Sequence, residues 1–257
     1  MRQHCLIMVA FITIAASLYA QDGSVSDSTA FQSGVVHKTN LFNTPCTRFI
    51  IPATLISYGV LAQIAKPLRQ FDENTDNEVS KHFTHRRTFD NTLQYAPVVA
   101  VYGLDFMGIK AKNNFRDRTF VVITSHLIMG GAVQTVKKAT GVERPDGSNY
   151  LSFPSGHTAT AFTGAHILFK EYKDVSPWIG VAGYAAATTV GTMRVLNRKH
   201  WVSDVVAGAG VGILSVEIGY MLLPVFHKII GVESKSNLVI MPVVGNNQYG
   251  LGMACVF

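Results

Sequence analysis

The sequence predicts an all-α protein: a helical bundle of about six core helices, followed by a short C-terminal β-hairpin. Residues 49–230 consist largely of apolar segments of helical length, and 48% of the chain is hydrophobic while only 15% is charged. Residues 231–257 instead contain two strand-like segments around a polar turn. Three polar clusters interrupt the apolar sequence between residues 137 and 204. Because polar groups are costly to bury without partners, we expect these clusters to form the functional site.

Residues 1–20 have the pattern of a secretory signal peptide. An apolar core from Cys5 to Ala16 is followed by small residues and a plausible cleavage point after Ala20. An uncleaved anchor is the alternative, although the core is short for a membrane span. Residues 21–48 are polar and are expected to form a flexible leader. We therefore expect an exported protein of the periplasm, soluble or membrane-associated; an integral membrane protein whose site faces the periplasm is the alternative.

Apolar segments separated by short polar connections make up the predicted helical domain. Asp117 stands where a carboxylate can satisfy free N–H groups at the start of a helix. The most charged stretch, residues 66–91, is expected to form a surface helix or a solvated loop. The last two apolar segments are rich in Ala and Gly, which permits close helix packing. The expected helices are residues 49–65, 93–110, 119–136, 157–171, 177–193 and 201–223.

The C-terminal tail has a different pattern. Residues 238–244 and 249–257 flank the turn at residues 245–248, which is typical of a β-hairpin. Two strands cannot close a barrel, so we expect the hairpin to pack on the helical body. Whether Cys46 and Cys255 form a disulfide between the two ends of the mature chain stays open at this point, because their separation cannot be read from the sequence.

Membrane contact is possible for this chain, but full spanning is not the favoured interpretation. The helix candidates are about 14–20 residues long, which is short or marginal for a hydrocarbon core of about 30 Å. If all of them spanned, the loop at residues 137–156 would face the cytoplasm, which conflicts with an export signal. We therefore favour an exported helical body that at most touches the membrane. The net charge of +6 comes without a run of basic residues interleaved with aromatics, so no nucleic-acid partner is expected.

The first polar cluster contains two cationic side chains that can bind the same anion. Lys137 lies at the end of an expected helix, and Arg144 follows seven residues later, beyond the break at Thr140 and Gly141. Arginine offers a planar fork to two phosphate oxygens, and lysine offers a point charge. For this cluster taken alone, two solvated cations near a helix end are the default interpretation.

The second cluster, residues 154–157, opens a helix. A helix N-terminus presents unpaired N–H groups and the positive end of the helix dipole to an anion. Ser155 adds a hydroxyl donor, and Gly156 allows an oxyanion to approach the backbone. His157 would stand beside that anion, whose charge should favour the protonated imidazole and suit it to general-acid catalysis. The plain alternative is an ordinary serine N-cap with an incidental histidine.

The third cluster runs from Arg194 to Asp204. His200 and Asp204 are four residues apart, so on a helix Asp204 can accept a hydrogen bond from Nδ1 of His200 and leave Nε2 free to react. A helix-surface His–Asp pair is the alternative. Arg198 and Lys199 are expected to be solvated, with substrate contact left open.

The order and spacing of the three clusters resemble the type 2 phosphatidic acid phosphatase family, whose superfamily includes bacterial acid phosphatases and vanadium haloperoxidases. The family pattern is Lys-x6-Arg-Pro, then Pro-Ser-Gly-His, then Ser-Arg-x5-His-x3-Asp. Met193 stands where the family usually has serine, which we interpret as tuning and not as inactivation. The matching residues are Lys137, Arg144, Pro145, Pro154, Ser155, Gly156, His157, Arg194, His200 and Asp204.

The resemblance implies a role for each matching residue. His200 would be the nucleophile that forms a phosphohistidine, with Asp204 orienting it. His157 would protonate the leaving oxygen and then assist the attacking water. The phosphoryl oxygens would be held by Lys137, Arg144, Arg194, Ser155 and the N–H of Gly156. No metal and no other cofactor is expected, because no Asp/Glu cluster suited to Mg²⁺ accompanies the motifs.

The resemblance favours a metal-independent phosphatase acting on phosphate monoesters or pyrophosphates, with a phosphorylated lipid as the expected substrate. A periplasmic acid phosphatase for small, soluble phosphomonoesters is the main alternative. A vanadate-dependent peroxidase and a non-catalytic binder of anionic head groups are further alternatives, and Met193 is the one feature that favours the binder. The oligomeric state is left open by the sequence.

Overall fold

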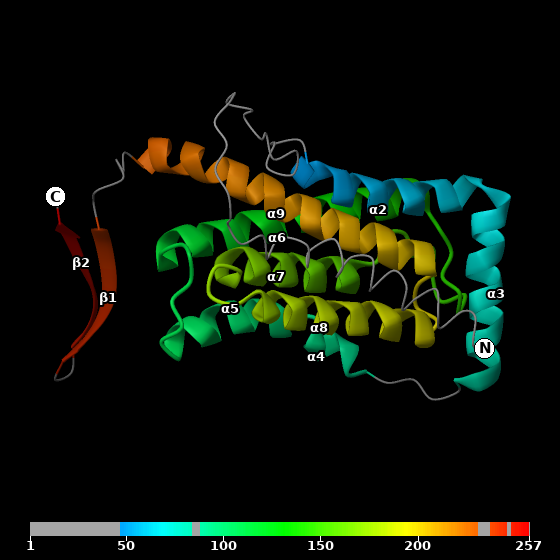
Figure 1. Cartoon of the computed structure of the whole chain (residues 1–257), viewed down its shortest axis with the longest axis horizontal. Coiled ribbons are helices and arrows are strands. Elements are labelled where there is room, and N and C mark those ends of the chain that lie inside the picture. Colours follow the sequence, from blue (N-terminus) through cyan, green and yellow to red (C-terminus); the bar gives the residue numbers. More distant parts are fainter. Residues whose placement is uncertain (1–46, 84–87, 231–236, 246–247, 257) are drawn as a thin grey trace, which may run out of the picture. The chain divides into compact units, whose positions relative to one another are not determined.

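The computed structural model describes residues 47–83, 88–230, 237–245 and 248–256 (Figure 1). The predicted signal peptide, almost all of the predicted leader and Cys46 lie outside these residues, so the pairing of Cys46 with Cys255 is not described either. The helices are α2 Thr47–Ile64, α3 Lys66–His82, α4 Asp90–Leu93, α5 Ala96–Phe106, α6 Phe115–Thr140, α7 Gly156–Tyr172, α8 Pro177–Leu196 and α9 Val202–Ile230.

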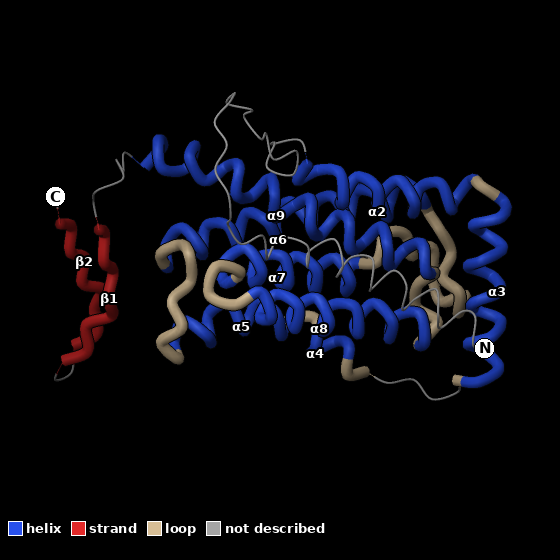
Figure 2. Tube along the Cα trace, in the orientation of Figure 1, coloured by secondary structure: helices blue, strands red, loops and turns tan. Residues whose placement is uncertain are grey.

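The predicted helical body is confirmed (Figure 2). The six expected segments correspond to α2, α5, α6, α7, α8 and α9. The charged stretch at residues 66–91 contributes two helices, α3 and the single turn α4, with residues 84–87 between them outside the described part. Residues 66–91 were expected to form a surface helix or a solvated loop, and α3 corresponds to the surface helix.

Local capping fixes both ends of α6. Its N-cap is Asn114, whose side chain accepts a hydrogen bond from the backbone N–H of Asp117. Asp117 itself lies in the first turn, so the carboxylate stands at the helix start as expected, but Asn114 provides the cap. Gly141 ends the helix with φ of 57°, a left-handed conformation that glycine adopts without strain. Lys137 consequently lies in the last turn of α6.

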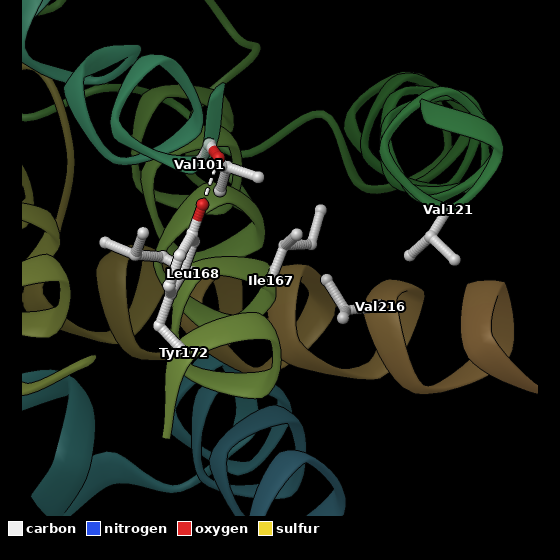
Figure 3. Close-up of a cluster of buried hydrophobic side chains, with 6 residues drawn as sticks. All are labelled: Val101, Val121, Ile167, Leu168, Tyr172 and Val216. Carbon is white, nitrogen blue, oxygen red and sulfur yellow. Dashed lines mark hydrogen bonds between the residues drawn. The ribbon is translucent and has the colours of Figure 1, made fainter. Parts of the chain in front are cut away.

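Helix α7 is the element around which the core is assembled. It packs against α5, α6, α8 and α9. Figure 3 shows one cluster of buried side chains contributed by α5, α6, α7 and α9, in which the Tyr172 hydroxyl donates to the carbonyl of Val101 over 2.7 Å. The buried residues of this cluster are Val101, Val121, Ile167, Leu168, Tyr172 and Val216. This cluster anchors the C-terminal half of α7, whereas near the second motif Ala159 packs in a separate cluster with Met129 and Val133 of α6.

Gly208 brings α9 into direct contact with the second motif. A Cβ at this position would lie 2.6 Å from the carbonyl oxygen of Ser155, closer than real Cβ atoms approach. We expect Gly208→Ala to lower the free energy of unfolding by about 1–3 kcal/mol, because the added methyl forces α9 away from the start of α7. Denaturant or thermal unfolding of the purified protein measures this.

Gly130 provides the control, because a Cβ there would meet nothing within 4 Å. Gly130→Ala is expected to leave stability unchanged or to raise it by about 0.5–1 kcal/mol, as alanine favours a helix interior. Equal stabilities of the two variants would show that the close contact at Gly208 does not matter.

At the C-terminus, strands β1 Asn237–Gly245 and β2 Gln248–Val256 pair antiparallel. Their register runs from Asn237 opposite Val256 to Gly245 opposite Gln248. The packing of this segment on the helical body stays a prediction.

Among the described residues, two helices are long and apolar enough to cross a membrane, namely α6 with 26 residues and α9 with 29. The expectation of short or marginal segments was therefore wrong for these two. Helix α6 continues into polar residues beyond its apolar centre, and α9 continues through Pro224 to Ile230. Helices α2 and α3 pass the same test as a pair but are bent by 89°. On α6, Ile123 and Leu127 are exposed by 53% and 68%, so this helix presents apolar side chains outward. These features favour membrane association; the side that the site faces stays a prediction.

Candidate active site

The polar clusters meet around His200, which is only 2% exposed. His200 lies in the turn between α8 and α9, not on a helix as expected, because α8 ends at Leu196 and Arg198 adopts a positive φ of 56°. Asp204 lies in the first turn of α9, and its Oδ2 is 3.4 Å from Nδ1 of His200. The predicted His200–Asp204 contact is therefore present, with the turn and not a helical face providing it.

Asp204 is held in place from several directions. Its Oδ2 accepts a hydrogen bond from the backbone N–H of Trp201 over 3.0 Å, the reach-back contact of a carboxylate at the third position of a helix. The same oxygen accepts the hydroxyl of Ser152 over 2.5 Å. The carbonyl of Asp204 accepts from the N–H of Ser155 over 3.0 Å, which ties the second and third motifs together.

Ser152 is a site residue that the motif analysis did not single out. It is completely buried, and its Oγ lies 3.5 Å from Nδ1 of His200 as well as against Asp204. The only signal in the sequence was its position two residues before the second motif. A hydroxyl there gives the histidine–carboxylate pair a third member.

Lys137 is buried at the end of α6 and supports the loop that carries Ser152. Its Nζ donates to the carbonyls of Leu151 and Ser152 over 2.6 and 3.1 Å. An ammonium group has three donors, so one is left for another acceptor. Because Cε of Lys137 would lie 4.0 Å from a Cβ on Gly156, the first and second motifs are adjacent.

Arg194, in the last turn of α8, has an ion-pair partner that the sequence did not reveal. Its Nη1 donates to Oδ2 of Asp90 over 2.7 Å, and both side chains are buried. No sequence pattern predicts this pair, because Asp90 lies 104 residues earlier, in the charged stretch.

The second motif forms the start of α7. Ser155 is its N-cap, with Oγ 3.5 Å from the N–H of Thr158 and 2.9 Å from the Thr158 hydroxyl. Gly156 is the first helical residue. Nε2 of His157 is 2.9 Å from Oδ1 of Asn91, a residue of α4. The serine-cap interpretation thus holds geometrically, and it places Ser155 and His157 beside the first and third motifs.

Positive charge dominates the electrostatics of the site. Burial, together with the charges of Lys137, Arg194 and Arg144, holds the pKa of His200 well below its usual value. Burial and the nearby charge of Arg194 lower the pKa of His157 to about 4. Burial and these charges outweigh the opposing effect of Asp90 in the free protein, and the expected rise in the pKa of His157 beside a bound anion stays a prediction. Both imidazoles are neutral near pH 7.

Three polar atoms of the motif residues are buried without a hydrogen-bond partner in the described part of the chain. Two are guanidinium donors, Nε of Arg144 and Nε of Arg194. The third is Oδ1 of Asp204. Unpaired buried donors are costly. The charges of Arg144 and Arg194 both lower the pKa of His200, so both guanidinium groups act electrostatically on this histidine.

Arg198 and Lys199 are partly exposed but form ion pairs, in contrast to the expectation of freely solvated side chains. Arg198 donates through Nε and Nη2 to the two carboxylate oxygens of Asp76, both over 2.7 Å, and Lys199 pairs with Asp146 over 2.7 Å. These pairs hold α3 and the loop after Arg144 against the turn that carries His200. These two ion pairs therefore stabilise the geometry of the site.

Helix α3 also borders the turn that carries His200. Its residues Asp72, Thr75 and Asp76 line, together with His200 and Trp201, a shallow depression that has no room for a water molecule. The charged stretch at residues 66–91 therefore reaches the site from two places, through α3 and through α4.

Comparison with known proteins supports the motif assignment. Residues 118–227, which include all three motifs, match the model of the PAP2 superfamily. The lipid A 1-phosphatase of Porphyromonas gingivalis is 39% identical over 167 residues, covering 63% of this chain and 37% of that protein. The lipid A 1-phosphatases of Rhizobium johnstonii and Rhizobium etli are 32% and 30% identical, and the chain covers 41% and 44% of them. The chain thus spans less than half the length of these relatives.

Two crystal structures are also similar to this chain. Aquifex aeolicus LpxE is matched with a TM-score of 0.43 and 22% identity, over 56% of this chain and 93% of that one. A transmembrane PAP2-type phosphatidylglycerolphosphate phosphatase of Bacillus subtilis is matched with a TM-score of 0.41 and 20% identity, over 70% and 97%. By the match of residues 118–227 and the 39% identity to the first relative, the chain is similar to the PAP2 superfamily, the type 2 phosphatidic acid phosphatases and their relatives.

Proposed function

We propose that this protein is a phosphatase that hydrolyses phosphate monoesters or pyrophosphates of lipids. The observation that carries the proposal is the pair of guanidinium groups of Arg144 and Arg194. Their Nε donors are buried without a partner among the described residues, and their charges act on a buried neutral histidine, His200. Such donors fit the oxygens of a phosphoryl group, and phosphoryl transfer depends mainly on positioning and on charge stabilisation. The three curated relatives are named lipid A 1-phosphatases, which supports a lipid substrate.

In the proposed reaction, Nε2 of His200 attacks phosphorus while the bond from phosphorus to the leaving oxygen breaks. The low pKa of His200 supports this role, because a neutral imidazole keeps a lone pair for attack. The Nδ1 proton faces Asp204, which stabilises the positive charge that develops on the ring. The products of this first step are a phosphohistidine and the free alcohol or phosphate.

His157 would supply the proton that the leaving oxygen takes up. A phosphoryl dianion beside His157 offsets the surrounding cations and so raises the pKa of His157 from its low value in the free protein. In the second step, a water attacks the phosphohistidine and gives a proton back to His157, while inorganic phosphate leaves and His200 is restored. The phosphoryl oxygens would be held by Lys137, Arg144, Arg194, Ser155 and the N–H of Gly156.

The outward apolar face of α6 supports a lipid as the substrate. A site next to helices that can enter a bilayer receives a phosphorylated head group without extracting the lipid. Export to the periplasm remains part of the proposal, and it rests on the pattern of residues 1–20.

A substrate panel tests the proposal. The purified protein in detergent micelles is assayed with phosphatidate, phosphatidylglycerol phosphate, undecaprenyl pyrophosphate, lipid A and p-nitrophenyl phosphate. We expect at least one lipid phosphate to be hydrolysed with a higher kcat/KM than p-nitrophenyl phosphate. A preference for the small ester would assign the chain to soluble phosphomonoesters. No hydrolysis of any ester, with phosphate still bound, would leave only a head-group binder.

Lys137→Ala is expected to weaken inhibition by orthovanadate by about tenfold to a hundredfold, the value of one hydrogen bond to a charged group. Lys138→Ala is the matched control, because Lys138 is the neighbouring cation on α6 and is exposed. Vanadate inhibition constants for the two variants give the comparison. Equal inhibition of Lys137→Ala and the wild type would remove Lys137 from the phosphate-binding set.

A further inference from the structure

Helix α4, Asp90–Leu93, lies outside the residues that match the family, yet it touches the site at two points. This single turn packs against α7 and α8, the helices that carry His157 and Arg194. Two adjacent side chains, Asp90 and Asn91, make the polar contacts.

Asp90 is 1% exposed, so its carboxylate is held entirely by protein groups. Oδ2 accepts from Nη1 of Arg194 over 2.7 Å, and Oδ1 accepts from Nδ2 of Asn197 over 3.4 Å. Because Asp90 engages Nη1, the guanidinium edge formed by Nε and Nη2 is left for a second acceptor. Nε of Arg194 is buried without a partner in the described part of the chain, so this edge suits two oxygens of an anion.

Asn91 makes the second contact, which fixes the proton on His157. Its Oδ1 is a neutral acceptor 2.9 Å from Nε2 of His157, so Nε2 carries a proton in both the neutral ring and the imidazolium. The hydrogen bond therefore selects one tautomer and one ring orientation. Asn91 is exposed, and its replacement leaves the buried core intact.

We propose that α4 is a positioning element of the phosphatase site, in which Asp90 orients Arg194 toward the phosphoryl oxygens and Asn91 orients His157 toward the leaving oxygen. The inference rests on the proposed function for the reaction that these residues support. Asp90 and Asn91 act through Arg194 and His157 and do not touch the substrate. One turn of helix thereby sets the relative positions of a phosphate-binding cation and the proton donor.

Several charged groups face His157, and α4 is only one source of them. Asp90 favours the protonated ring, whereas cations from three other parts of the chain oppose it. Changes on α4 must therefore be compared with a variant from the same turn that leaves these cations in place. The opposing cations are Arg194 on α8, Arg144 in the loop after α6 and Lys137 on α6.

The decisive experiment changes the charge and the hydrogen bond at Asn91. Asn91→Asp places a carboxylate against Nε2, so we expect the pKa of His157 to rise by about one unit and the alkaline limb of the kcat profile to move to higher pH by a similar amount. Asn91→Ala removes the acceptor, so kcat should fall about tenfold with KM changed less than about twofold. Thr92→Ala, an exposed change in the same turn, should match the wild type in the pKa of His157, the alkaline limb, kcat and KM.

Asp90 is tested with the isosteric variant Asp90→Asn, which keeps an oxygen acceptor for Arg194 but removes the charge. We expect kcat/KM to fall about tenfold and the alkaline limb to move to lower pH, because the carboxylate no longer favours the protonated His157. A purely structural role would instead lower the unfolding temperature and leave the position of the limb unchanged.

The pKa of His157 is read independently of turnover by NMR titration of its ring, assigned with a His157→Asn variant. If the wild type hydrolyses no phosphate ester, the proposed function fails, while a rise in the His157 pKa in Asn91→Asp still supports the positioning contact. If hydrolysis is present but the Asn91 variants behave as Thr92→Ala does in both the NMR titration and the pH profile, the inference about α4 is overturned.

Discussion

His200→Ala is expected to lose about 10⁴–10⁶-fold in kcat, because the variant has no nucleophile while its phosphate-binding groups are intact. The buried site should keep its shape, since the contacts of Asp204 with Trp201 and Ser152 do not involve the His200 ring. Initial rates with the best lipid phosphate of the panel, and vanadate or phosphate binding by calorimetry, measure the two properties separately.

The matched control is His126→Ala, which removes a partly buried histidine of α6 whose Nδ1 bonds only to the carbonyl of Val122 among the described residues. Its kcat should stay within about threefold of the wild type. A His200→Ala variant that turned over substrate as His126→Ala does would rule out nucleophilic catalysis by His200.

Asp204→Asn has the second largest expected effect, a loss of about 10²–10⁴-fold in kcat. The amide keeps the size of the side chain but no longer carries the negative charge that stabilises the developing imidazolium of His200. It also replaces an acceptor of the Ser152 hydroxyl and the Trp201 N–H, so the ring of His200 is held less firmly. Binding of the substrate should change little. A fall in kcat with an unchanged KM would therefore distinguish this effect from a loss of phosphate affinity.

Asp72→Asn is the control for Asp204→Asn. Asp72 is also a buried carboxylate, and it accepts from the N–H and hydroxyl of Ser203, the residue next to Asp204. Among the described contacts, it does not touch His200. Its replacement should cost less than about tenfold in kcat. Comparable losses in the two variants would mean that Asp204 acts through packing at the start of α9 and not on His200.

The sequence predicted the helices and the motif residues because both signals are local. Apolar runs located α2 and α5 to α9, and the fixed spacings brought Lys137, Arg144 and His200 into one hypothesis. The helices α6 and α9 are longer than expected. Polar residues near its ends do not stop α6, because capping favours its continuation, as at Asn114, and Pro224 does not stop α9.

The partners of the motif residues could not be predicted, because they come from distant segments that carry no pattern of their own. Asp90 is 104 residues from Arg194, and Asn91 is 66 residues from His157. Only the folded bundle brings α4 to the ends of α7 and α8. The turn that carries His200 could not be predicted, because a spacing of four residues between His200 and Asp204 is also compatible with a helix.

The central claim, that His200 accepts the phosphoryl group, is tested most directly by trapping the intermediate. The protein is mixed with a substrate carrying radiolabelled phosphate, denatured in alkali, in which phosphohistidine survives, and digested for peptide mapping. The account predicts label on the peptide that contains His200, in an amount that rises in His157→Asn if that variant slows hydrolysis of the intermediate more than its formation, and no label in His200→Ala. Turnover with label on another residue, or with no covalent label in wild type or His157→Asn, would contradict it.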